Sequence, residues 1–347
     1  MKFNWKECTL GDFITFQRGY DLPKSQMING KYPVVGSNGI IGYHNEYTTE
    51  FPSITIGRSG NVGNPFIVYG RTWSHNTTLY VKDFKGNDPT FVFYFLKIMN
   101  LANYAGGSAV PTLNRNHIHT LPIKVPESVE AQKKIGHYLR LLDEKIELNH
   151  AINKNLQQQA QALYQQMFIT NRNPNWKNGL LSDLVAVKYG KDHKKLEDGV
   201  YPVYGSGGIM RYVEKPLYTG ESVLIPRKGT LNNVMYVNGT FWSVDTMFYT
   251  EMLRSNVAKF VYHFVKSKDL ASMNAGSAVP SMTTNILNAM QLYIPDNETL
   301  STFEEILSPM YSQMQENEKQ SKKLAELRDT LLPRLMSGDI DVSEIEF

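Results

Sequence analysis

Two arginines in glycine-rich surroundings, Arg58 and Arg227, carry the clearest potential for chemistry in this sequence. A guanidinium group donates paired hydrogen bonds to a phosphate or to guanine, and an asparagine amide does the same to adenine. Loops rich in such side chains beside glycine turns are typical of a DNA-binding surface. The candidate DNA contacts are the two arginines and their polar neighbours, namely Ser59, Asn61, His75, Ser108, Asn114, Arg115 and Asn116 in the first half, and Lys228, Thr230, Ser277, Thr283, Thr284 and Asn285 in the second.

Residue patterns that would support catalysis or metal binding are missing from the sequence. Gly36–Gly42 lacks the Gly-Lys-Ser/Thr ending of a phosphate-binding loop, and Gly57–Gly63 is only superficially like a dinucleotide fingerprint. His117 and His119 are too few to hold a metal, and the single cysteine, Cys8, excludes a multi-thiolate site. There is no Gly-x-Ser-x-Gly elbow, no methyltransferase motif and no convincing nuclease carboxylate cluster. We therefore predict no catalytic residue, no metal site and no bound cofactor.

The composition limits the class of protein. The chain has 347 residues, of which 41% are hydrophobic, so it is too long for one ordinary core and too apolar for disorder. No apolar stretch approaches the roughly 20 residues that span a bilayer. The N-terminus also lacks the apolar run of a signal peptide. These features predict a soluble, cytoplasmic protein with at least two domains.

The formal net charge of +3 conceals an alternation along the chain. Residues 1–125 and 171–295 carry +5 each, residues 126–170 are neutral, and residues 296–347 carry −7. Two basic blocks that alternate with less basic ones suggest an internal repeat. The basic blocks are the natural places for an acidic ligand such as DNA.

A shift of 169 residues reveals the repeat directly. It aligns Arg58 with Arg227, Trp73 with Trp242, and the run Gly-Ser-Ala-Val-Pro at 107–111 with the same run at 276–280. The chain is therefore a tandem duplication of one basic domain followed by a less basic tail. The alternative for the shared residues is a role in the buried frame of each domain, which suits the tryptophans better than the arginines.

Each tail has the seven-residue periodicity of a long helix that pairs with another helix. Polar residues lie in the middle of both seams, where they cost stability but determine the register. We predict that the two helices form an antiparallel coiled coil; the alternative is that each packs on its own domain. Pro309 should kink the second helix, and Pro333 should end or bend it. The expected seam contacts are Ile135, Leu139, Leu142, Ile146, Asn149, Leu156 and Leu163 in the first tail, and Phe303, Leu307, Met310, Met314, Asn317, Leu324 and Leu331 in the second.

Each basic domain is expected to be mixed, with much β-structure. The runs Ser53–Ile56 and Thr78–Val81 are typical of strands between turns, whereas Thr90–Met99 and its counterpart Lys259–Lys268 are typical of buried helices. The predicted fold class is α+β, with a tandem duplication of two globular mixed α/β domains, each followed by a long helix. The predicted boundaries are 1–127 and 172–297 for the domains, and 128–171 and 298–347 for the helices and tail.

Short motifs recur in a fixed order along nearly the whole chain. They are Trp5…Leu10-Gly11-Asp12…Gly19, Tyr32-Pro33-Val34…Gly36-Ser37, Trp73-Ser74, Gly107-Ser108…Pro111, the domain exit Leu121-Pro122-Ile123…Pro126…Glu130-Ala131-Gln132…Ile135, and the closing segment Leu331–Ile340. Together they resemble the DNA-specificity (S) subunit of type I restriction–modification systems. The second domain exit departs from the pattern, because Ile294-Pro295 is present but the glutamine at the helix start is not.

The resemblance implies that each basic domain is a target-recognition domain that reads one half of a bipartite, asymmetric site on double-stranded DNA. The helices would set the spacer between the half-sites and bind two modification subunits. S-adenosylmethionine, ATP and Mg²⁺ would then act on the modification and restriction subunits, and this chain would carry no catalytic residue. The alternatives are the specificity region of a fused restriction–methylation enzyme, and a tandem interaction module that does not bind DNA. Binding by such a module would be insensitive to salt.

Overall fold

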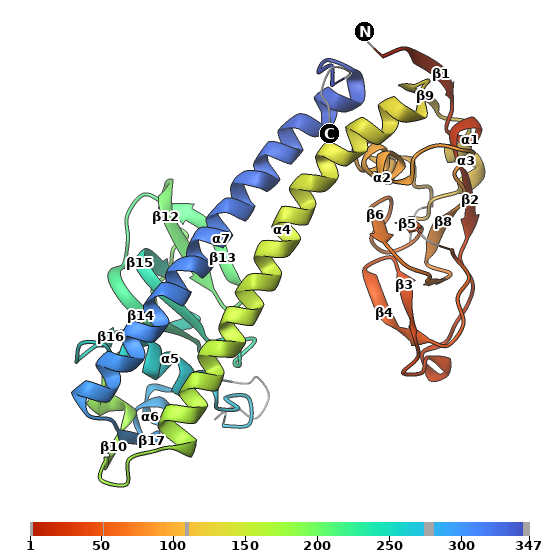
Figure 1. Ribbon diagram of the computed structural model, residues 1–347. Coiled ribbons are helices and arrows are strands. Elements are labelled where there is room, and N and C mark those ends of the chain that lie inside the picture. Colours follow the sequence, from red (N-terminus) through yellow and green to blue (C-terminus); the bar gives the residue numbers. More distant parts are fainter. Residues whose placement is uncertain (1–2, 51, 108–110, 274–280, 343–347) are drawn as a thin grey trace. The chain divides into compact units, whose positions relative to one another are not determined.

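The structure is a computed structural model that describes residues 3–50, 52–107, 111–273 and 281–342. It divides into two compact units (Figure 1). Unit 1 comprises Met1–His150 with Glu318–Phe347, and unit 2 comprises Ala151–Asn317. Each unit therefore contains one basic domain and a segment of both long helices, α4 (Val129–Tyr164) and α7 (Asn297–Ser337).

The basic domain of unit 1 consists of three small β-sheets with short helices against them. The strand orders are β2-β8-β5-β6, β4-β3-β7 and β1-β9. The strands are β1 (Trp5–Thr9), β2 (Thr15–Arg18), β3 (Tyr32–Gly36), β4 (Gly39–His44), β5 (Ser53–Gly57), β6 (Pro65–Val68), β7 (Trp73–Ser74), β8 (Thr78–Asp83) and β9 (Pro122–Pro126), and the helices are α1 (Leu10–Phe13), α2 (Pro89–Ile98) and α3 (Arg115–His119). The expected strands are β5 and β8, and the expected buried helix is α2.

Helix α2 shows why this segment folds locally as the sequence indicates. The side chain of Asp88 accepts a hydrogen bond from the Phe91 N–H, and Pro89 occupies the first helical position, which needs no donor. Six consecutive side chains from Phe91 to Leu96 are buried. The helix is therefore surrounded by protein and contributes to the domain core on every side.

The basic domain of unit 2 repeats this arrangement with one continuous sheet. Its strand order is β11-β16-β14-β15-β12-β13, and β10 pairs with β17. The strands are β10 (Lys177–Leu180), β11 (Val185–Tyr189), β12 (Asp198–Gly205), β13 (Gly208–Val213), β14 (Tyr218–Pro226), β15 (Met235–Ser243), β16 (Met247–Met252) and β17 (Gln291–Ile294), and the helices are α5 (Ala258–Lys266) and α6 (Thr284–Asn288). Helix α5 is the expected counterpart of α2.

Among the described residues, the sheet of unit 2 is continuous at a position where unit 1 has a proline. Strand β14 pairs with β15 along its length, including Glu221 opposite Asn238. The residue of unit 1 at the position of Glu221 is Pro52, which has no N–H to donate to a sheet. The ladder of unit 1 is reduced there to an isolated bridge between Thr49 and Thr72, and its edge is divided into β6 and β7.

The ends of the long helices belong to the domain cores. In unit 1, Ile135 and Leu139 of α4 and Leu335 of α7 lie in the same buried cluster as helix α2. In unit 2, Tyr164 of α4 and Phe303 of α7 do the same around helix α5. The alternative in which each helix packs on its own domain is thus partly correct, because α4 packs on the first domain with its first turns and on the second with its last.

Between these ends, the α4 and α7 segments of each unit run side by side in opposite directions (Figure 1). In unit 1, Asn149 donates to Ser321 at 3.2 Å. In unit 2, Asn317 donates to Asn153 at 2.8 Å, and Asn153 donates to the Met314 carbonyl at 3.0 Å. The polar residues predicted for the middle of the seams are therefore aligned and hydrogen-bonded, and the antiparallel pairing is confirmed. Among the other seam residues, Leu142, Ile146, Leu156, Leu163, Met310, Leu324 and Leu331 are half-buried, and Met314 is buried.

Pro333 does not end the second helix, because α7 continues to Ser337 and also passes through Pro309. A bend at Pro333 and a kink at Pro309 stay predictions. A proline inside a helix costs about 3 kcal/mol. Burial of an aliphatic or methionine side chain gains roughly 2 kcal/mol, and Leu335 and Met336 beyond the proline are both buried in the core of unit 1. The helix stops just before Gly338, whose φ of 81° is the left-handed conformation typical of a helix C-terminus.

Candidate nucleic-acid interface

Arg58 and Arg227 are held by the same backbone frame in the two units. The Arg58 N–H donates to the Thr77 carbonyl at 2.8 Å, and the Arg58 carbonyl accepts from the Leu113 N–H at 2.9 Å. Unit 2 repeats both hydrogen bonds at 2.9 Å each, on Arg227, Thr246 and Met282. Since the backbone is anchored on both sides, the side chain at this position can be presented in a defined direction.

Glycine turns complete the frame. Gly60 and Gly229 both have a φ of 82°, where a side chain would be strained, and each lies against a serine, Ser37 or Ser206. Turn geometry therefore accounts for the glycine that the two halves share here. The indole N–H groups of the paired tryptophans also bond to the frame: Trp73 donates to the Tyr20 carbonyl at 3.5 Å, and Trp242 donates to the Lys191 carbonyl at 2.8 Å. This supports a structural role for both tryptophans.

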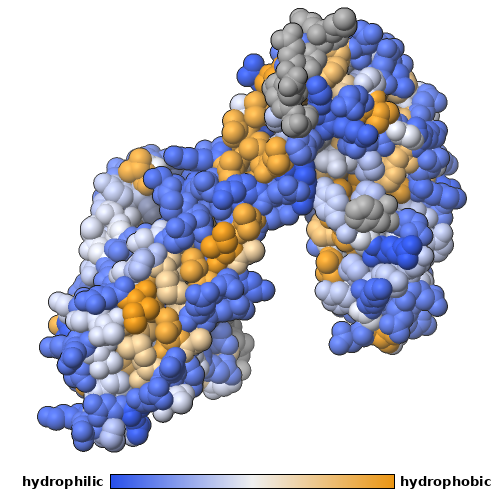
Figure 2. Space-filling view, in the orientation of Figure 1, coloured by the Kyte–Doolittle hydropathy of each residue, from blue (hydrophilic) through white to orange (hydrophobic). Residues whose placement is uncertain are grey.

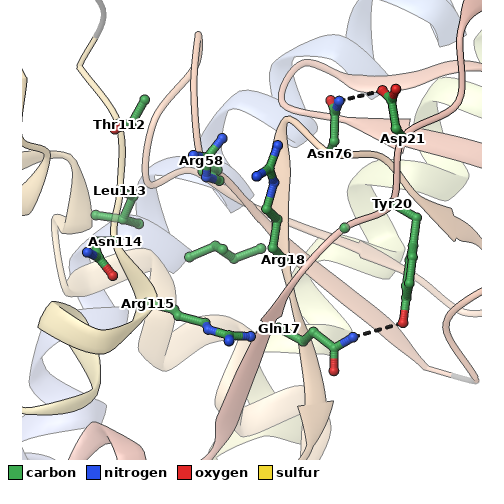
Figure 3. A pocket seen from close by; sticks show the side chains of 12 residues that line it. Gln17, Arg18, Tyr20, Asp21, Arg58, Asn76, Thr112, Leu113, Asn114 and Arg115 are labelled. Atoms are coloured by element: carbon green, nitrogen blue, oxygen red, sulfur yellow. Dashed lines mark hydrogen bonds between the residues drawn. The ribbon is translucent and has the colours of Figure 1, made fainter.

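In unit 1 the frame surrounds an open hollow of about 800 Å³ (Figure 3). It is lined by Gln17, Arg18, Gly19, Tyr20, Asp21, Arg58, Asn76, Leu79, Thr112, Leu113, Asn114 and Arg115. Arg18 comes from the end of β2, Arg58 from the turn after β5, and Arg115 from the start of α3. Three arginines far apart in the sequence therefore meet at one hollow.

The three guanidinium groups have no protein partner within the described residues, where none of them forms an ion pair or a side-chain hydrogen bond. Arg58 is half-buried, whereas Arg18 and Arg115 are exposed. Burial lowers the pKa of Arg58, and the like charge of Arg18 lowers it further. The acid of the hollow, Asp21, is occupied by the Asn76 amide at 2.5 Å. The hollow thus carries three cationic side chains against one carboxylate and has a net positive charge.

The corresponding positions of unit 2 carry different side chains. Tyr189 replaces Arg18, Thr284 replaces Arg115, and Asp245 replaces Asn76. The remaining arginine, Arg227, is 5.4 Å from the Tyr189 ring centroid and donates to the Asp245 carbonyl at 3.4 Å. Lys191 and Lys228 are exposed nearby in sequence, at the positions of Tyr20 and Ser59. The same backbone frame therefore presents one arginine against an aromatic ring in unit 2, and three arginines around one hollow in unit 1.

The other predicted contacts divide into exposed and structural positions. Asn61, Asn116, Lys228, Thr230 and Asn285 are exposed. Asn114 and Thr283 cap helices α3 and α6, since their side chains accept from the N–H groups of Asn116 at 3.0 Å and Ile286 at 3.3 Å. His75 is half-buried with its Nδ1 3.0 Å from the Thr77 hydroxyl, and Ser59 bridges to Thr112. Ser108 and Ser277 lie outside the described residues. A role in DNA contact stays a prediction for all of these residues.

Sequence reasoning missed Arg18, Gln17, Tyr20 and Asn76, which also line the hollow of unit 1. A comparison of the two halves identifies residues that are the same in both, and these residues build the shared backbone frame. Positions at which the halves differ, such as Arg18, are not found in this way. The available signal was proximity to a shared glycine, because Arg18 directly precedes Gly19 and Tyr189 directly precedes Gly190. Both glycines contact a backbone carbonyl so closely that a Cβ would lie about 2 Å from its oxygen.

The histidines near this hollow have structural partners. The Nε2 of His119 accepts the Phe16 N–H at 3.0 Å, and the two rings stack at 6.1 Å. Burial lowers the pKa of His119, which favours the neutral ring that this hydrogen bond needs. The described residues contain no group of three or more His, Cys, Asp or Glu side chains placed to hold a metal ion.

The fold and the two frames define a tandemly duplicated protein in which two similar basic domains present different polar side chains. The chain belongs to the family described as the type I restriction modification DNA specificity domain, whose model matches residues 3–158 and 173–327. It is 24% identical to a putative type I specificity subunit of Mycoplasma pneumoniae, over 96% of both chains. It is 21% identical to the MjaIX specificity subunit of Methanocaldococcus jannaschii, over 74% of this chain and 70% of the relative.

The fold is also that of a solved relative. The crystal structure of the S subunit of a type I restriction–modification system from M. genitalium superimposes with a TM-score of 0.70 at 18% sequence identity, and the match covers 96% of both chains. The predicted fold class is therefore confirmed. Among the described helices, none is long and apolar enough to cross a membrane.

Proposed function

We propose that this chain is the non-catalytic DNA-specificity subunit of a type I restriction–modification complex. Each domain reads one half of a bipartite, asymmetric site on double-stranded DNA. The observation that carries the proposal is the pair of equal frames with unequal polar side chains, Arg18, Arg58 and Arg115 in one and Tyr189, Arg227 and Thr284 in the other. Two readers with one architecture and different contacts are what an asymmetric site requires.

Long helices that carry exposed apolar residues suit the docking of two modification subunits. In unit 1, Leu141 and Leu148 of α4 are 44% and 51% exposed, and they are seven residues apart on one helix face. Leu327 of α7 is 46% exposed. Figure 2 shows hydrophobic patches over the helical segments amid a largely hydrophilic surface. Restriction subunits would join the full complex, and S-adenosylmethionine, ATP and Mg²⁺ would be held by the partners, in a cytoplasmic setting.

The decisive experiment is co-expression with the cognate modification subunit, followed by mapping of methylated adenines in the host DNA. We expect one bipartite, asymmetric motif with a fixed spacer. A matched variant, Leu148→Asp, should reduce co-purification of the modification subunit, whereas Glu147→Asp at the neighbouring exposed position should not. Absence of any bipartite methylated motif in the presence of a stable complex would overturn the proposal.

The spacer function has its own test. Insertion of seven residues into each long helix keeps the heptad seam in phase and lengthens each helix by about 10.5 Å. Since successive base pairs are about 3.4 Å apart, the spacer should grow by about three base pairs while both half-sites stay unchanged. A methylated motif with the original spacing would show that the helices do not set it.

A further inference from the structure

The three arginines of the unit 1 hollow differ from almost all other arginines of the chain. Seven of the other eight have a side-chain hydrogen bond, an ion pair or an aromatic ring as partner within the described residues. Arg18, Arg58 and Arg115 have none and line one space. Within the described residues, three of the four arginines without such a partner therefore line the same hollow.

The positive charges around the hollow, of which Arg18 acts directly on Arg58, indicate the chemistry of the ligand. Like charges brought close together disfavour the unoccupied state, and the partial burial of Arg58 removes some of the water that would screen it. An anion with several acceptor oxygens relieves both effects and suits the paired donors of guanidinium groups. A base edge is neutral and would leave most of the repulsion in place. The ligand that fits is therefore a phosphate group.

The hollow is rigid enough to hold such a group in place. Gly19 is packed so closely that an added Cβ would lie 2.1 Å from the His75 carbonyl oxygen, so the strand end that carries Arg18 has little freedom. Arg58 is anchored on both sides by backbone hydrogen bonds to Thr77 and Leu113. Figure 3 shows Arg18 beside Arg58, with Arg115 extending toward Gln17.

We propose that this hollow is a backbone-phosphate site through which the first domain grips DNA independently of base sequence, with Arg18 and Arg115 as its anchors. This inference rests on the proposed function. The counterpart positions, Tyr189 and Thr284, carry hydroxyl groups without a positive charge and cannot supply charge-assisted contacts. The duplicated domains have therefore diverged in how they hold the backbone as well as in which bases they read.

The test uses the complex of the full chain with its modification subunit and a duplex that carries the mapped site. Arg18→Tyr and Arg115→Thr introduce the residues found in unit 2. Each removed phosphate contact should lower the slope of log affinity against log salt by about one. Between about 50 and 200 mM salt, the affinity of the unaltered complex should then fall about threefold more than that of either variant, and about tenfold more than that of the double variant.

A second measurement separates phosphate from base contact. Neutral methylphosphonate linkages placed singly along the first half-site should weaken the unaltered complex at one position and have no further effect there on Arg18→Tyr. The control is Arg71→Gln, which removes a charge of the same domain that already pairs with Glu50 at 2.9 Å. Circular dichroism should show that the variants remain folded, since Arg18 and Arg115 are exposed.

Two outcomes would overturn the inference. One is an unchanged salt slope in the double variant. The other is a changed base preference in the methylated motif of Arg18→Tyr, which would make Arg18 a base reader. Either result leaves the proposed function intact as long as the unaltered complex methylates a bipartite motif, so the two proposals fail separately.

Discussion

The two units attach their basic domains to the long helices at equivalent positions with different chemistry. In unit 1, the Tyr94 hydroxyl of α2 donates to Asp143 of α4 at 2.6 Å, and Arg328 of α7 bonds to the same carboxylate. In unit 2, the equivalent positions are His263 of α5 and Tyr311 of α7, whose ring nitrogen and hydroxyl oxygen are 3.0 Å apart. One contact site has therefore been kept after duplication while its charged acceptor has been replaced by a neutral group.

The frames around Arg58 and Arg227 show the same kind of divergence on the surface. A shared backbone frame tolerates Arg18 or Tyr189 because its hydrogen bonds are made by main-chain groups. After the duplication, the backbone geometry stayed the same while the side chains changed. This holds both where the domains contact the helices and where they would contact DNA. Substitutions at these positions should reveal how far the stability and the DNA binding of each unit depend on its own side chains.

The largest effect is expected for the buried ion cluster around Lys259 in unit 2. Lys259 is 3% exposed and bonds to Glu304 and, at 3.2 Å, to Glu221. Lys259→Met removes the cation from these carboxylates, which keep only the Tyr236 and Ser308 hydroxyls as donors, and should lower the free energy of unfolding of unit 2 by about 3–5 kcal/mol. Hydrogen exchange of peptides from each unit measures this. The matched change in unit 1, Thr90→Met, should alter the free energy of unfolding of unit 1 by about 1 kcal/mol or less. Equal losses in both units would show that the ion cluster around Lys259 is not the source of the effect.

The next effect depends on pH. Burial lowers the pKa of His263 to about 4, so the folded state binds its proton less readily than the unfolded state does. This stability is present above the ordinary pKa of about 6.5 and is lost as the pH falls toward 4, by about 3 kcal/mol in total. His263→Gln should weaken the pH dependence of urea unfolding of unit 2 across this range. The exposed His137→Gln should leave it unchanged, and a pH dependence retained in full by His263→Gln would refute the argument.

The polar layers of the helix pair should differ in strength. Asn153→Leu removes the acceptor of the Asn317 amide and the donor to the Met314 carbonyl, and should destabilise the helix pair of unit 2 by about 1–3 kcal/mol. Asn149 also donates to Gln320 at 2.9 Å, and Gln320 is exposed and can bond to water instead. Asn149→Leu should therefore cost unit 1 about 1 kcal/mol, mainly through the lost hydrogen bond to Ser321. Thermal unfolding of both variants checks this order, and a stabilised Asn153→Leu protein would reverse our interpretation.

A reciprocal change sharpens the comparison of the hollows. Tyr189→Arg places beside Arg227 the side chain that unit 1 has beside Arg58. It should raise the salt slope of DNA binding by about one, which is an affinity change of about threefold between 50 and 200 mM salt. The conservative Tyr189→Phe serves as the control. A Tyr189→Arg slope equal to that of the unaltered complex would mean that the second frame does not face the DNA backbone.

The smallest effect is expected at the exposed pair of Arg71 and Glu50, whose side chains are 48% and 67% exposed. Such pairs contribute about 0.2–1 kcal/mol. Arg71→Gln should therefore change the free energy of unfolding of unit 1 by less than about 1 kcal/mol in urea titrations. A larger loss would indicate that the Arg71 guanidinium, 4.5 Å from the Tyr47 ring centroid, also stabilises unit 1 through its contact with this ring.

Local patterns in the sequence determined the duplication, the two long helices and the aligned polar residues of their seam. Heptad spacing acts over a few residues, so Asn149, Asn153 and Asn317 could be placed before any tertiary contact was known. The family followed from motifs in a fixed order. The same local reasoning could not exclude a helix end at Pro333, because the buried residues that carry the helix past it belong to a core built from distant segments.

Only the tertiary structure decided which residues meet at the candidate site. Arg18 and Arg115 are separated by almost a hundred residues, and no periodicity relates them to Arg58. They converge because the end of β2, the turn after β5 and the start of α3 are brought together by sheet pairing and backbone hydrogen bonds. Sequence identity between the two halves identified the residues of the shared backbone frame. The side chains that differ between the halves could be assigned to one site only from the folded structure, because the fold places them around one hollow.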